Sequence, residues 1–102
     1  MDYVALLRFR ESVNGAERDA ALARRAGWSF PAGVKVVFEY WPVAADLQVV
    51  TVFSTDDPAA MMEVVFQWND VFDIDVHPAL SAEDGLRIGM DVFPRLPRLQ
   101  QG

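Results

Sequence analysis

The sequence contains no cysteine, a single lysine and a single histidine, His77. The absence of cysteine excludes disulfide bonds, thiolate metal sites and a cysteine nucleophile. Acidic residues outnumber basic ones and give a formal net charge of −6. Because an acidic surface repels phosphate backbones and anionic lipids, we expect neither a nucleic-acid partner nor a membrane partner.

Recognisable catalytic and targeting motifs are also missing. The chain has no glycine-rich phosphate loop, no G-x-S-x-G elbow and no H-E-x-x-H pair, so no motif names a reaction and we expect no cofactor and no metal. Its first residues do not form a signal peptide, and no apolar run reaches membrane-spanning length. We therefore expect a cytoplasmic protein, and whether it is an enzyme stays open.

What is present is a short chain that is rich in apolar residues. A length of 102 residues indicates one domain with a small core. Hydrophobic residues make up 52% of the chain, which favours a sheet with both faces covered or a second subunit over one face. Arginine, alanine and valine are abundant, as is typical of proteins from high-GC bacterial genomes.

The pattern of apolar residues predicts strands and helices in turn. Alternation predicts four strands, over residues 2–10, 34–41, 47–54 and 72–77. Asn14 and Glu17 predict a capping box at the start of a helix that ends at Gly27. Pro58 opens a second helix, and after Ser81 the pattern fits a short helix or a strand, of which we favour the helix.

The order strand, helix, strand, strand, helix, strand predicts a ferredoxin-like α+β fold with an extra short C-terminal helix. In this fold the helices cover one face of a four-stranded antiparallel sheet, and the fourth strand lies at an edge beside the first. We assign residues 1–94 to a single protomer domain and residues 95–102 to a flexible tail. The buried stripe of the first helix is mostly alanine with Leu22, so we expect this helix to pack close to whatever lies beneath it.

Several predicted strands are apolar on both sides, although the helices cover only one face. The uncovered face would carry Val4, Leu6, Val37, Trp41, Val50 and Val52. At about 25 cal/mol per Å², burying roughly several hundred Å² of this face would be worth many kcal/mol before association costs. We therefore expect a homodimer whose two sheets pack face to face as a dimeric α/β barrel.

Four segments, WSFPAGVKV, EYW, DDPAA and WNDVFDIDVHPAL, together resemble the short bacterial family named domain of unknown function 3303. The resemblance spans residues 1–86 in order and spacing, and the tail after Ser81 departs from the pattern. It implies a dimeric α/β-barrel fold and no particular activity, because none is established for the family. The wider superfamily includes cofactor-free oxygenases and haem-degrading enzymes, but the latter place an asparagine on the first strand, and residues 4–9 contain none.

One predicted strand carries a polar row, Asp73, Asp75 and His77, on the side opposite its apolar residues. Arg8 shares the side of this row, so we expect a cross-strand arginine–aspartate pair. On the second predicted strand, we expect the side chains of Lys35, Glu39 and Trp41 to lie on the same side of the sheet as this row. The row is either a solvated edge or the polar patch of a barrel pocket, and metal binding is a third alternative for which the spacing is not diagnostic.

The leading hypothesis is a homodimer that binds a small aromatic or anionic molecule in its barrel, with acid–base chemistry if it is an enzyme. The candidate catalytic residues are His77, Glu39 and Asp75. The candidate ligand-binding residues are Arg8, Trp41, Asp73, Trp68 and Trp28. Two alternatives stay open: a non-catalytic structural or regulatory dimer whose barrel is filled by side chains, and a cofactor-free monooxygenase-like enzyme.

Overall fold

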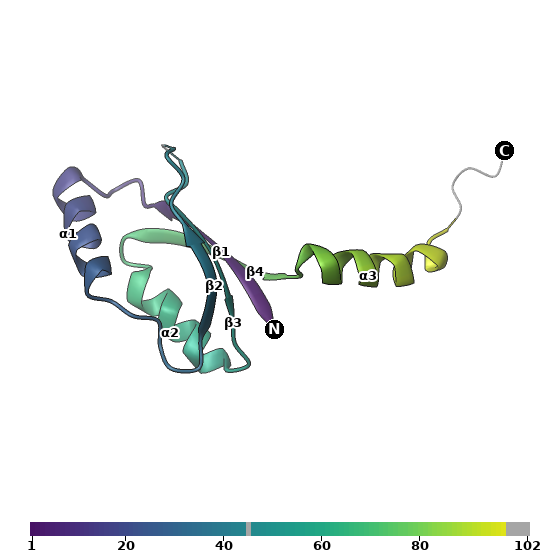
Figure 1. The fold of residues 1–102 in the computed structure, drawn as a ribbon. Coiled ribbons are helices and arrows are strands. Elements are labelled where there is room, and N and C mark those ends of the chain that lie inside the picture. The colour runs from purple at the N-terminus through teal and green to yellow at the C-terminus, as the bar shows by residue number, and fades with distance from the viewer. Residues whose placement is uncertain (45, 98–102) are drawn as a thin grey trace.

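A computed structural model describes residues 1–44 and 46–97 of the chain. Four strands form one antiparallel sheet in the order β2–β3–β1–β4, with α1 and α2 on one side of it (Figure 1). The elements are β1 (Asp2–Phe9), α1 (Gly15–Ala26), β2 (Lys35–Tyr40), β3 (Val49–Ser54), α2 (Pro58–Trp68), β4 (Phe72–Ala79), α3 (Ala82–Val92) and a short 3₁₀ helix η1 (Phe93–Arg95). The predicted ferredoxin-like class, with its extra C-terminal helix, is confirmed. Most of the predicted tail, residues 98–102, lies outside the described residues.

Side-chain caps determine where the helices begin. The Glu17 N–H donates to Asn14 Oδ1 over 2.8 Å and the Asn14 N–H donates back to Glu17 Oε1 over 3.3 Å, so the predicted capping box is present. Asp57 caps α2 directly before Pro58. The hydroxyl of Ser81 accepts a backbone N–H of the first turn of α3, and this segment is therefore a helix and not a strand.

The register of the central strand β1 separates the two faces of the sheet. Ala5 pairs with Thr51 and Val76 and is buried beneath the helices. Val4 and Leu6 point to the opposite side, because successive side chains of a strand alternate. We call the side without α1 and α2 the open face, and its apolar strand residues are Val4, Leu6, Phe38, Tyr40, Val50 and Val52.

A β-bulge in β2 changes which residues of that strand face the helices. The pairing with β3 shifts between Val36 and Phe38, and after the shift Glu39 pairs with the buried Thr51. Glu39 and then Trp41 therefore lie on the helix side. The prediction that these two residues share a side with the polar row was wrong, because the sequence pattern carries no sign of the extra residue.

The core lies at one end of the helix layer. Its buried residues are Ala21, Trp68, Val71 and Phe72. The Arg24 guanidinium lies 4.4 Å from the centre of the Trp68 ring and donates to the Gln67 carbonyl over 3.0 Å. These contacts attach the end of α1 to the end of α2.

Two apolar surfaces remain uncovered. On the open face, Tyr40 is 70% exposed and Phe38 is 40% exposed. The helix α3 projects beyond β4, away from α1 and α2, and none of its residues is buried (Figure 1). The radius of gyration is 17.6 Å, whereas a compact chain of about 100 residues has about 13 Å. The excess reflects the projection of α3 from the rest of the molecule.

Candidate functional site

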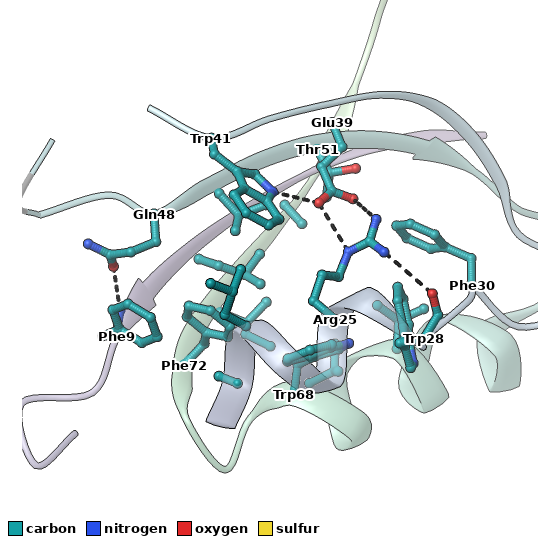
Figure 2. Close-up of a pocket in the computed structure, with 18 of the residues that line it drawn as sticks. Phe9, Arg25, Trp28, Phe30, Glu39, Trp41, Gln48, Thr51, Trp68 and Phe72 are labelled. Atoms are coloured by element: carbon teal, nitrogen blue, oxygen red, sulfur yellow. Dashed lines mark hydrogen bonds and ion pairs between the residues drawn. The ribbon is translucent and has the colours of Figure 1, made fainter. Parts of the chain in front are cut away.

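A cavity of about 340 Å³ lies between the helix layer and the sheet (Figure 2). Leu7 and Ile74 form part of its floor, and its other walls include Leu22 of α1 and Val64 of α2. Most of the lining side chains are apolar. Leu22 is 57% exposed and Trp41 is 50% exposed, which places the opening between α1 and the end of β2.

Large aromatic rings pack together at the core end of the cavity. Trp28 packs edge-on against Trp68 with the ring centres 5.5 Å apart, and the Trp68 ring lies 6.0 Å from that of Phe72. Ala21, on the alanine-rich side of α1, is buried in the same cluster as Trp68 and Phe72. The alanine-rich stripe of α1 therefore packs onto the core beneath it at Ala21, while Leu22 and Arg25 border the cavity.

An ion pair and an indole form one polar part of the cavity wall. Arg25 Nη2 lies 2.9 Å from Glu39 Oε1, Arg25 Nε donates to Glu39 Oε2 over 3.3 Å, and Trp41 Nε1 donates to the same Oε2 over 2.7 Å (Figure 2). The Glu39 side chain is 15% exposed, and these charge-assisted bonds offset the cost of removing its carboxylate from water. Arg25 thereby links α1 to β2 across the cavity.

The guanidinium of Arg25 has more N–H groups than its neighbours use. Besides its bonds to Glu39, its Nη1 donates to the Trp28 carbonyl over 3.4 Å. The remaining N–H groups have no partner among the residues that the structure describes. Because Arg25 and Glu39 together are neutral, these groups suit a hydroxyl or carbonyl oxygen better than a full negative charge.

Of the other polar side chains that line the cavity, those of Gln48 and Thr51 hold the strands in place. The Oε1 of Gln48 accepts the Phe9 backbone N–H over 2.6 Å, and the Thr51 hydroxyl donates to the Phe38 carbonyl over 2.8 Å. Thr51 is also fully buried, at 4% exposure. Arg18 and Asp19 also line the cavity, but as an ion pair with 61% and 71% exposed side chains, so Arg25 with Glu39 is the charged pair of the wall that is better shielded from water.

The polar row of β4 lies on the open face. Arg8 Nη1 is 3.1 Å from Asp75 Oδ2, so the predicted cross-strand arginine–aspartate pair is confirmed, and Arg10 Nη1 is 3.6 Å from Asp73 Oδ1. His77 is exposed at the far end of the row. Each of these ion pairs is largely exposed and contributes roughly 0–1 kcal/mol to stability. In the single chain the row faces solvent.

The candidate site residues thus fall into two groups on opposite faces of the sheet. The cavity is lined by Glu39, Trp28, Trp41 and Trp68. The open face carries Arg8, Lys35, Asp73, Asp75 and His77. Because the sheet lies between them, one protomer does not bring Glu39 and His77 together as an acid–base pair.

Sequence reasoning missed Arg25. Arg25 is a basic residue in the last turn of α1, where it interacts favourably with the helix dipole. This common role explains its presence in the sequence, so nothing there indicates an ion pair with a distant strand. The signal that could have found it is Glu39 itself, because a carboxylate on an apolar strand needs a cationic partner when it is removed from water.

No group of three or more histidine, cysteine, aspartate or glutamate residues that could hold a metal ion occurs within residues 1–44 and 46–97. Over the same described ranges, no helix has the length and apolar character needed to cross a bilayer.

The comparison with known families gives one match. Residues 1–93 match the family model described as Domain of unknown function (DUF3303). The match includes α3, so the expectation that the chain departs from the family pattern after Ser81 was wrong. No curated protein and no solved structure matches the chain.

Proposed function

The chain belongs to the DUF3303 family, and from this premise we propose that it binds a small aromatic molecule in the cavity between its helices and its sheet. The proposal rests on one observation. A chain of only 102 residues contains a cavity of about 340 Å³ with mostly apolar walls. Ligand sites in proteins have volumes of about 300–1,000 Å³ and combine apolar walls with a few polar groups. Each protomer therefore carries a complete candidate site.

An empty cavity of this size would be costly. At about 24 cal/mol per Å³, a void of 340 Å³ would cost about 8 kcal/mol, whereas a whole domain is stable by about 5–15 kcal/mol. Water can enter through the opening, but apolar walls offer it few hydrogen bonds. A molecule with an apolar body that displaces this water gains free energy.

The size and the walls of the cavity favour a planar ligand of about two rings. An apolar cavity of about 150 Å³ accepts benzene, so 340 Å³ has room for roughly twice that molecule. The indoles of Trp28, Trp41 and Trp68 offer ring contacts. Arg25 and Glu39 offer hydrogen bonds to one neutral polar group, so we favour a neutral aromatic ligand over an anionic one.

A titration with model ligands tests this proposal. All three tryptophans line the cavity, so their indole N–H signals in the NMR spectrum of isotope-labelled protein report its occupation. We expect a naphthol to shift these signals saturably, a naphthoate to bind more weakly, and a saturated bicyclic alcohol of equal size to bind more weakly still. Absence of a saturable shift with either aromatic compound would refute the proposal.

A pair of variants shows whether the naphthol enters the cavity. Leu22→Trp places a large ring at the opening and should weaken naphthol binding at least about tenfold. Met62→Trp is the matched control, because Met62 is an exposed apolar residue of α2, at 52% exposure, that does not line the cavity. Equal affinity of the two variants would contradict the proposed location.

A second candidate function, self-association, is supported by the exposed apolar residues of the open face. A second copy over this face would form the dimeric barrel and would enclose Asp73, Asp75 and His77, which acid–base chemistry there requires. The expected sedimenting mass is about twice the protomer mass of 11.4 kDa. Leu6→Glu, near the centre of the face, should return the protein to protomers, and a wild-type protein that sediments as a single protomer at micromolar concentration would contradict self-association.

A further inference from the structure

We propose that α3 is an arm that packs against a second copy of this chain, so that the homodimer is held by two exchanged α3 helices as well as by the open face. The inference rests on the proposed self-association. It does not depend on ligand binding in the cavity, because α3 contributes no residue to the cavity wall.

The two sides of α3 differ in polarity. The helix has its charged residues on one side, and they are Glu83, Asp84, Arg87 and Asp91. On the other side Leu86 is 69% exposed and Met90 is 63% exposed, and Phe93 continues this side at 63% exposure. An apolar stripe of this kind is ordinarily buried, and the single chain buries none of its residues.

The helix also needs a partner in order to be stable. It has 11 residues, and isolated helices shorter than about 12–15 residues are marginal in water. Gly85 and Gly89 lower its intrinsic helix propensity further. The capping bond at Ser81 stabilises only the first turn. Packing of the apolar side against another surface is therefore what holds α3 as a helix.

The direction of α3 identifies a second copy as this surface. The helix leaves the sheet on the side opposite α1 and α2 (Figure 1). A copy that docks on the open face occupies the space beside the projecting helix, and twofold symmetry then places each α3 against the other copy. Stable interfaces bury about 800 Å² on each partner, and the arm adds its apolar side to that of the open face. The net charge of −6 disfavours nucleic acid and anionic membranes as the occupant.

Substitutions on the two sides of α3 test the arm. The double variant Leu86→Asp with Met90→Asp places charge on the apolar side, and we expect the dimer dissociation constant in sedimentation equilibrium to rise about tenfold or more. Arg87→Asp introduces the same side chain on the polar side and should change the constant less than about threefold. A dimer that is unaffected by the double variant would overturn the arm and leave the open-face dimer standing. A wild-type protein that is monomeric would overturn both.

Hydrogen exchange supplies a readout that does not require a variant. The amides of α3 should be protected above the dimer dissociation constant and exchange freely below it, whereas the amides of β1 should stay protected at both concentrations. Free exchange of α3 at every concentration would overturn the arm. Protection of the β1 amides in the double variant shows that its protomer is folded, so a loss of dimer cannot be mistaken for unfolding.

Discussion

Replacing Glu39 by glutamine removes one charge from the ion pair that joins α1 to β2. Arg25 Nη2 and Glu39 Oε1 are 2.9 Å apart, and the two side chains are 34% and 15% exposed. Breaking a fully buried pair costs about 3–5 kcal/mol, but water solvates part of the Arg25 guanidinium here. We therefore expect Glu39→Gln to lower the free energy of unfolding by about 1–2 kcal/mol.

The neighbouring ion pair of α1 provides the matched control. Arg24 Nη2 lies 3.2 Å from Asp70 Oδ2, and these side chains are 38% and 60% exposed. Asp70→Asn should cost less than about 1 kcal/mol, because both charges are well solvated. Urea denaturation measures both variants, and each kcal/mol corresponds to roughly 4–8 °C in Tm for a domain of this size. If Glu39→Gln costs no more than Asp70→Asn, the reasoning from burial is refuted.

The same variant changes the charge of the cavity. Without the Glu39 carboxylate, the Arg25 guanidinium keeps its positive charge next to a bound molecule. We expect Glu39→Gln to bind a naphthoate more tightly than a naphthol, which reverses the order expected for the wild type. Calorimetric titration of both compounds measures the order, and an unchanged preference would show that Arg25 and Glu39 do not contact the ligand.

Two further predictions concern the turns and caps that position the site. Asn14→Ala removes the capping box of α1 and should lower the free energy of unfolding by about 1 kcal/mol in urea denaturation, and a neutral result would mean that α1 contributes little to the folded state. Gly33 has a φ of 91°, in a region that residues with a Cβ rarely adopt. Gly33→Ala should therefore lower the free energy of unfolding by about 1–2 kcal/mol. The cost comes from the backbone and not from a clash, because the added Cβ would lie an ordinary 3.8 Å from the nearest atom, the Ala60 Cβ. Equal stability of this variant and the wild type in thermal unfolding would show that the loop adopts another conformation.

The element order could be predicted because each element has a local signal. Asn14 and Glu17 mark the start of α1, and Asp57 with Pro58 marks the start of α2. Alternation along β1 separates its two sides. These signals lie within a few residues of one another, so a single sequence contains all the information that they require.

The location of the site could not be predicted, because it depends on contacts between distant residues. The segment around Val37 is apolar on both sides, so its alternation does not reveal the bulge that turns Glu39 toward the helices. The wall of the cavity includes the packed rings of Trp28, Trp68 and Phe72, which come from separate segments of the chain. Tryptophan at helical spacing is ordinarily a core residue, and the sequence does not distinguish a filled core from a cavity.

Intermolecular nuclear Overhauser effects between a bound naphthol and methyl groups of the protein test the central claim most directly. Ligand binding between the helices and the sheet predicts contacts to the methyl groups of Leu7, Val64 and Ile74, which line the cavity. Contacts to Val4, Leu6 and Val52 on the open face, with none to the cavity residues, would contradict the claim and place the ligand in the barrel between two copies.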